Sequence, residues 1–120
     1  MHEEPKVSQH LVDGVRVIRV EGDVDVDGAE PLKDSLSCTD TGSTGGTVVD
    51  LSAVRFADST MLHILLEAQR AHRAAGRQLV VSGPFGVIVE RLFDVTGTTS
   101  FFTMAPSTEA ARDLAGSSGG

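Results

Sequence analysis

The side chains of this sequence that could do chemistry together lie between Asp58 and His63. Ser59 and His63 are four positions apart, so on a helix they would be neighbours, as a nucleophile and its base must be. An aspartate could then orient the base. However, His63 falls on the polar, solvent-facing arc of the predicted helix, and no glycine-flanked elbow surrounds Ser59. These residues therefore predict no catalytic site, and we expect a protein that is not an enzyme.

Two other interpretations of Ser59 remain open. In the first, Asp58 caps a helix and Ser59 is a favourable residue of its first turn. In the second, Ser59 presents its hydroxyl on a protruding strand–helix junction, where an added phosphate would carry about −1.5 to −2 charges. The helix dipole would favour that phosphate, whereas Asp58 and Asp25 would repel it. The modification would make a partner-facing patch strongly anionic without unfolding the chain.

Metal and cofactor sites are not predicted. The lone Cys38 excludes an intramolecular disulfide and a multi-cysteine zinc site. The glycine-rich segment 41–46 lacks the lysine of a phosphate-binding loop and precedes a strand, so we interpret it as a flexible connector. His72 falls inside the apolar arc of its helix and is expected to be a packed core residue. The histidines are scattered without carboxylate partners at ligand spacing: His2, His10, His63 and His72.

Composition limits the possible partners. The chain has 120 residues, enough for one domain, and 40% of them are hydrophobic. Its formal net charge is −7 and its lysines and arginines do not cluster, which disfavours nucleic acid as a partner. No apolar run approaches the ~20 residues needed to span a bilayer, and the acidic N-terminus is unlike a signal peptide. We therefore expect a cytoplasmic protein with no membrane partner.

The elements alternate along the chain. A turn at Asp13-Gly14 between strands at 7–12 and 15–20 predicts a hairpin. Two strands followed by alternating helices and strands predict an α/β domain with a mixed sheet and helices packed against it. Further strands are expected at 47–51, 78–82 and 100–104. Helices are expected from a candidate N-cap at Asp27 with Pro31 in the first turn, over 58–75, from Val87 to a stop at Gly97, and after a cap at Ser107.

The helix over 58–75 has an apolar arc of roughly 200°, which is wider than a sheet requires. The extra width indicates either contact with a second helix or a partner surface near Met61 and Ile64. The pattern of residues leaves both alternatives open.

Three segments, in order, resemble a known family. The segment Glu21–Asp25, with Ala29 and Leu32 behind it, is similar to a strand end and first helix of STAS domains. Val48–Thr60 resembles their central strand and serine junction, and Val89–Gly97 resembles their late helix and its glycine stop. The resemblance spans roughly residues 10 to 115. It is most specific to the small bacterial anti-sigma factor antagonists.

The resemblance implies a mixed, mainly parallel sheet surrounded by helices. We expect the STAS domain to occupy residues 7–115, after an N-terminal extension at 1–6 and before a disordered tail at 116–120. It also implies partner switching. The unphosphorylated protein would bind an anti-sigma factor that is a serine kinase, and so release a sigma factor. Phosphorylation of Ser59 would end that binding, and a serine phosphatase would restore it.

The resemblance also implies that the chain itself holds no cofactor, because ATP would be bound by the partner. Met61 stands where the family has glycine, so its bulk could retune the choice of partner. Thr60 is a minor alternative phosphoacceptor. The alternative function is a STAS-type interaction or small-ligand-binding module with a different partner and no phosphoregulation. The resemblance also implies that Asp25 and Asp58 lie beside Ser59 and shape the contact with the kinase. The expected partner-binding residues are Asp25, Asp58, Ser59, Thr60, Met61, His63 and Ile64.

Overall fold

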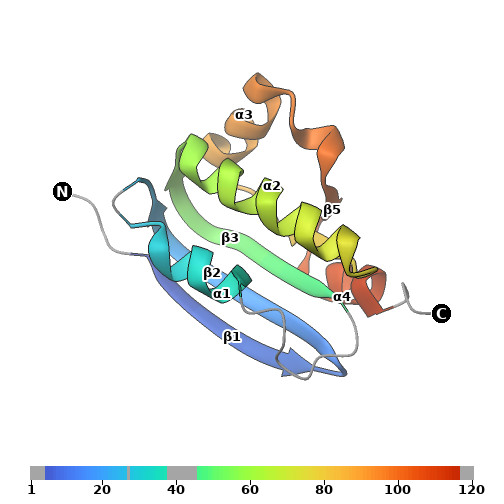
Figure 1. Ribbon diagram of the computed structural model, residues 1–120. Coiled ribbons are helices and arrows are strands. Elements are labelled where there is room, and N and C mark those ends of the chain that lie inside the picture. The colour runs from blue at the N-terminus through green and yellow to red at the C-terminus, as the bar shows by residue number, and fades with distance from the viewer. Residues whose placement is uncertain (1–4, 27, 38–45, 117–120) are drawn as a thin grey trace.

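The computed structural model describes residues 5–26, 28–37 and 46–116 (Figure 1). In this part of the chain a five-stranded sheet has the spatial order β1-β2-β3-β4-β5. The first two strands are antiparallel and every later pair is parallel, so the sheet is mixed and mainly parallel, as predicted. The strands are β1 (Lys6–Val12), β2 (Val15–Val24), β3 (Thr47–Ala57), β4 (Leu79–Ser82) and β5 (Thr103–Ala105).

The predicted N-terminal hairpin is confirmed. Val12 pairs with Val15, and the two residues between them have positive φ angles, 51° at Asp13 and 81° at Gly14. Two positive φ angles are what a tight two-residue turn of the right twist requires, and Asp-Gly adopts them at low cost. The turn therefore fixes the register that places Ile18 and Val20 on the inner face of the sheet.

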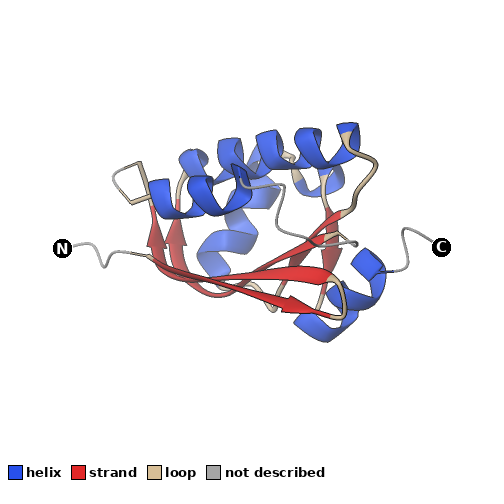
Figure 2. Ribbon diagram, turned by 60° about the horizontal axis from the view of Figure 1, so that its bottom comes forward, coloured by secondary structure: helices blue, strands red, loops and turns tan. Residues whose placement is uncertain are grey.

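Helices cover the two faces of the sheet unequally (Figure 2). Three of the described helices, α1 (Glu30–Ser37), α2 (Ser59–Ala74) and α3 (Val87–Thr96), lie on one face, while α4 (Thr108–Gly116) lies on the other. Because side chains alternate along a strand, each face has its own core. The main core includes Ile18, Leu32, Leu51, Met61 and Leu65, and the smaller core under α4 includes Val15, Val17, Val48, Val80 and Ala111.

The helix ends follow local signals in the sequence. Pro31 stands in the first turn of α1, where its missing N–H costs nothing. Gly97 ends α3 in the left-handed conformation, with a φ of 68°. Ser107 accepts a hydrogen bond from the Ala110 N–H at 3.2 Å and so caps α4. These three predictions are confirmed.

The prediction of a strand over 100–104 is wrong in its first half. A short 3-10 helix, η1 (Thr99–Phe101), occupies that part, and β5 begins only at Thr103. The ring of Phe102 is buried and meets the ring of Phe93 edge-on, with centroids 5.6 Å apart. The chain turns there to insert this ring into the core, so tertiary packing overrides the strand preference of the segment.

One further difference concerns a strand that is otherwise as expected. The strand predicted at 47–51 continues to Ala57, because its parallel pairing with β2 runs that far. In α3 the buried residues are Val89 and Phe93, whereas Val87 and Ile88 are exposed. The predictions for Asp27, Cys38, residues 41–45 and the chain ends at 1–4 and 117–120 lie outside the described residues.

Candidate functional site

The carboxyl ends of β2 and β3 bring two aspartates together. Val24, the last residue of β2, pairs in parallel register with Ala57, the last residue of β3. Asp25 and Asp58 come directly after this pair. The Asp58 N–H also donates to the Val24 carbonyl oxygen at 3.2 Å, which ties the start of the next helix to the neighbouring strand. The site is therefore built on hydrogen-bonded backbone from two strands.

Asp58 is the N-cap of α2, as predicted. Its backbone is extended, and its Oδ1 accepts a hydrogen bond from the Thr60 N–H at 2.9 Å. Its carbonyl oxygen accepts from the Met61 N–H at 3.1 Å. Two of the N–H groups that an α-helix leaves unpaired at its start are therefore already bound, one of them by a carboxylate. An anion arriving at this helix end would meet the Asp58 charge first.

Asp25 is held in a tight loop after β2. Asp25 is only 7% exposed, and its Oδ1 accepts from the Gly28 N–H at 3.0 Å. This loop packs against Pro5, because a Cβ on Gly28 would lie 2.9 Å from the Pro5 Cδ. Glycine is the residue that permits that approach. The loop thus fixes a second carboxylate beside the junction of β3 and α2.

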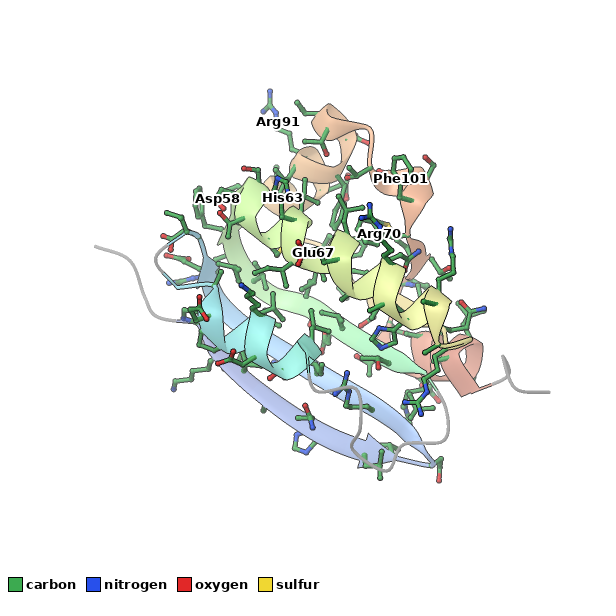
Figure 3. All side chains as sticks on the ribbon, in the orientation of Figure 1. Asp58, His63, Glu67, Arg70, Arg91 and Phe101 are labelled. Carbon is green, nitrogen blue, oxygen red and sulfur yellow. The ribbon has the colours of Figure 1, made fainter. Side chains whose placement is uncertain are left out.

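Ser59 is exposed and begins α2. It opens the solvent-facing stripe of that helix, which continues through His63, Glu67 and Arg70 along the side seen in Figure 3. Residues three and four apart share a face of a helix, which explains this spacing. Thr60 is half-buried beside Ser59. The exposed positions of Ser59 and His63 agree with their prediction as surface residues.

The structure corrects the prediction of a partner surface near Met61 and Ile64. Met61 is fully buried and Ile64 is 9% exposed, and both belong to the main core. They share the inward stripe of α2 with Leu65 and Ala68, since residues three, four and seven apart on a helix lie on one side. The extra width of the apolar arc is filled by contact with α1. Of the two alternatives, packing within the chain is therefore right, and these two side chains do not face a partner.

Two exposed apolar residues at this end of the sheet escaped sequence reasoning. Val26 follows Asp25 and is 72% exposed, and Phe56 precedes Asp58 by two residues and is 37% exposed. The sequence signal that could have revealed these two residues is an apolar side chain close to an aspartate at the end of a strand. Exposed apolar area near a polar rim is typical of binding surfaces. Val26 and Phe56 are thus exposed apolar residues close in sequence to the two aspartates of the site.

The site lacks the geometry of a nucleophile and base among the residues that the structure describes. The Ser59 hydroxyl makes no hydrogen bond to His63 there, and the Asp58 carboxylate binds a backbone N–H rather than an imidazole. Within the same residues, no group of three or more His, Cys, Asp or Glu could hold a metal ion. The arrangement offers an accessible hydroxyl next to the half-buried Asp58, whereas the Asp25 carboxylate is buried.

His72 lies near the opposite end of α2 and is buried, as predicted. Its Nδ1 donates to the Ala68 carbonyl oxygen at 2.7 Å, so its Nε2 accepts from the Thr47 hydroxyl at 2.8 Å. Burial lowers the pKa of His72, and although the Ala68 carbonyl raises it, the charges of Arg16 and Arg77 lower it further. The imidazole is therefore a neutral core group with both nitrogens satisfied.

Comparison with known families identifies the domain. The family model described as "Mlab, STAS domain" matches residues 7–103. The chain belongs to the STAS domain family. Its resemblance to that family, inferred from three sequence segments, is therefore confirmed. A comparison with curated protein sequences finds no significant match.

Solved structures share the fold of this STAS domain. An anti-sigma factor antagonist from Mycobacterium paratuberculosis is 26% identical with a TM-score of 0.81, over 93% of this chain and 94% of that one. RsbS from Moorella thermoacetica is 22% identical with a TM-score of 0.74, over 91% and 93%. The anti-sigma factor antagonist SpoIIAA in its unphosphorylated form is 19% identical with a TM-score of 0.74, over 91% and 96%. These likenesses confirm the predicted α/β fold.

No helix in the described part of the STAS domain is long and apolar enough to cross a membrane.

Proposed function

We propose that this STAS domain is an anti-sigma factor antagonist that works by partner switching at Ser59. The unphosphorylated form binds an anti-sigma factor with serine kinase activity, which holds the ATP, and a sigma factor is released. The kinase transfers the γ-phosphoryl group of ATP to the Ser59 hydroxyl, leaving ADP, and the complex separates. A serine phosphatase hydrolyses the phosphoserine and restores binding. This cycle runs in the cytoplasm and needs no catalytic group in the STAS domain.

The observation that carries the proposal is the exposed Ser59, directly after the capping Asp58 and at the strand end that neighbours Asp25. A phosphate on Ser59 adds about −1.5 to −2 charges beside Asp58 and Asp25. The first-turn N–H of Thr60 is already bound by Asp58, so it is not available to neutralise the new charge. Burying that added charge in an interface without a matching donor costs several kcal/mol of hydration free energy. A loss of this size weakens binding by tenfold or more.

Relatives support the same cycle. The similar chain from Mycobacterium paratuberculosis is an anti-sigma factor antagonist. SpoIIAA is a solved antagonist of the same fold that exists in an unphosphorylated and a phosphorylated form. Carried over to this chain, that pair of states corresponds to Ser59 with and without its phosphate.

The alternative function, a STAS-type module with a different partner and no phosphoregulation, is favoured by two other comparisons. The matching family model carries the name Mlab beside STAS. The same fold also occurs within a murine Slc26a9 anion transporter, of which this chain covers 22%. A partner that binds regardless of the state of Ser59 would identify this second class.

The decisive experiment captures partners from the native host on Ser59→Ala and Ser59→Asp baits and identifies them by mass spectrometry. We expect the alanine bait to hold a kinase-like anti-sigma factor and the aspartate bait to lose it. The purified pair, titrated by calorimetry, should show at least about tenfold weaker binding to Ser59→Asp. Incubation of the wild-type pair with ATP should then place one phosphate on Ser59, read by mass spectrometry.

A matched control adds the same charge elsewhere. Ser100→Asp, on the exposed surface of η1, should bind the partner as the wild type does. Equal affinity of Ser59→Ala and Ser59→Asp for the captured partner would contradict the switch. Equal losses in Ser59→Asp and Ser100→Asp would show that net charge, and not the site, decides binding.

A further inference from the structure

A second polar site lies at the other end of α2. An open pocket of about 440 Å³ is formed by the C-terminal half of α2, the loop that follows it and the first residues of β4 and β5. Its polar lining residues are Gln69, Arg73, Arg77, Gln78 and Thr103. Arg73 lies fourteen residues after Ser59, so at 1.5 Å per residue about 21 Å of helix separates this pocket from the acidic site.

The pocket is positively charged on a negatively charged protein. Acidic residues outnumber basic ones by 17 to 10 in the chain, yet the sequence contains no Asp or Glu between Glu67 and Glu90. Arg70, Arg73 and Arg77 all fall within that stretch, and two of them line the pocket. None of the lining residues in the described part of the chain is acidic. The local field therefore favours an anion.

The helix end beneath the pocket does not cancel this field. A helix C-terminus carries partial negative charge on its last carbonyl oxygens. Here the His72 carbonyl accepts from the Arg77 N–H at 2.8 Å, and the Arg73 carbonyl accepts from the Gly76 N–H at 3.1 Å. These carbonyls are occupied by backbone donors. Among the described residues that line the pocket, the charged ones are Arg73 and Arg77.

Neutral groups complete the set of donors. The Gln69 side chain is held in place, because its Nε2 donates to the Phe101 carbonyl oxygen at 2.6 Å. Thr103, with a hydroxyl, and Gln78, with an amide, are also lining residues. Guanidinium, hydroxyl and amide donors around one cavity match a tetrahedral oxyanion with several acceptor oxygens. Arginine in particular binds phosphate through paired N–H donors.

We infer that this pocket binds the phosphate group of a small phosphorylated molecule. Its volume is in the range of known ligand pockets and exceeds that of a single phosphate, so part of the organic group is accommodated as well. The polar walls favour a hydrophilic group over a lipid chain. This site uses none of the residues around Ser59, so it goes beyond the proposed switch and is independent of it.

The test is an NMR titration of the full chain with inorganic phosphate and with pyrophosphate, at constant ionic strength. We expect saturable shifts at the backbone amides of Gly76, Gln78, Leu79 and Thr103, with pyrophosphate binding more tightly. Arg73→Gln should weaken binding roughly tenfold, because it removes a charge-assisted contact. Arg73 is exposed, so this variant should keep the wild-type melting temperature. Thr103→Val removes a hydroxyl from the same pocket without changing its charge, and it should also weaken binding.

Arg91→Gln is the matched control. It removes the same charge from an exposed position on α3, away from the pocket (Figure 3), and should leave binding unchanged. Equal losses in Arg73→Gln and Arg91→Gln would overturn the inference, as would shifts that grow linearly without saturating. Binding of poly-L-glutamate without binding of either phosphate would overturn it too, and would assign the arginines to an acidic protein partner. All of these outcomes are independent of the Ser59 experiment.

Discussion

Asp58 has two roles at the level of a single residue, because one carboxylate both caps α2 and stands beside Ser59. Two substitutions of Asp58 separate the capping role from the role of its charge. Asp58→Ala removes the cap and should lower the free energy of unfolding by about 1 kcal/mol, whereas Asp58→Asn keeps the cap and should cost less than about 0.5 kcal/mol. Urea unfolding of the two variants measures the difference. Equal destabilisation would show that charge, and not the hydrogen bond to Thr60, stabilises the helix end.

Asp58→Asn then isolates the role of the charge in recognition. It removes one of the two carboxylates beside Ser59 while leaving the helix intact. If acidic surface attracts the kinase, this variant should bind the anti-sigma factor more weakly than the wild type, with a steeper loss at low salt than at high salt. Calorimetry at two ionic strengths tests this, and affinity unaffected at both would remove Asp58 from the contact.

Met61 stands where the STAS family has glycine. Because the Met61 side chain is buried, we expect a substitution at this position to affect the packing of the core. Met61→Gly should destabilise the domain by about 3 to 6 kcal/mol, from the emptied core and the poor helix propensity of glycine. Met61→Leu keeps the volume and should cost less than about 1.5 kcal/mol. Chemical unfolding gives both values.

Partner binding provides the contrast for Met61. Met61→Leu should leave the affinity for the anti-sigma factor within about twofold, because the side chain does not reach the surface, whereas His63→Ala should weaken it about tenfold if that residue is a contact. A large effect of Met61→Leu on affinity, in a variant of unchanged stability, would place Met61 in the interface after all.

At the level of elements, His72 couples α2 to β3 through its hydrogen bond with the Thr47 hydroxyl. The pKa of His72 is lowered in the folded protein, chiefly by burial, so the unfolded chain binds a proton more readily than the native one. This contribution to stability is fully present above the ordinary value near 6.5 and is lost as pH falls. Below that pH the free energy of unfolding should drop by up to about 1.4 kcal/mol per pH unit.

Urea unfolding at pH 7.5 and pH 5.5 measures this loss. His72→Asn removes the titrating group and should flatten the dependence, even if it lowers stability at both values. A wild-type slope retained in His72→Asn would assign the acid sensitivity to other groups.

Elements with strong local signals were predictable from the sequence, and those set by packing were not. The start of α2 is marked by a capping aspartate before a long apolar periodicity, and both features are local. The position of Phe102 depends on its packing against Phe93 of the preceding helix, so the segment around η1 looks like a strand until the core is known. The exposure of Val87 and Ile88 on α3 is also set by packing. Both residues are apolar, but they lie away from the sheet, and the sequence does not show which side of the helix the sheet contacts.

The site was predictable only in part for a related reason. Its residues are adjacent in space because Val24 and Ala57 end neighbouring parallel strands, and strand register is not visible in a single sequence. The resemblance to STAS domains supplied the proximity of Asp25 and Asp58 that periodicity could not. The exposure of Val26 and Phe56 depends on where those strands end, which neither line of reasoning gave.

At the level of the whole molecule, α4 closes one face of the sheet by itself among the described helices. The matching family model stops at residue 103, before this helix. A chain truncated after residue 106 would uncover four valines of the smaller core, at a cost on the order of 1 kcal/mol each, against a total stability of about 5 to 15 kcal/mol. We expect it to melt at a lower temperature and to bind a hydrophobic dye, whereas a chain ending at 116 should not. An unchanged melting temperature would contradict the predicted domain end at residue 115.

The hydrogen bond from the Asp58 N–H to the Val24 carbonyl has a consequence for timing. It anchors Ser59 to the hydrogen-bonded end of the sheet, so a phosphoryl group can be added or removed there without a segment having to fold or unfold. The delay of such a switch is then set by enzyme turnover and by dissociation of the partner, and not by a slow conformational step. A cell using such a switch would adjust the speed of its response through the amounts of kinase and phosphatase. Between signals, the phosphorylated or unphosphorylated state of Ser59 would persist.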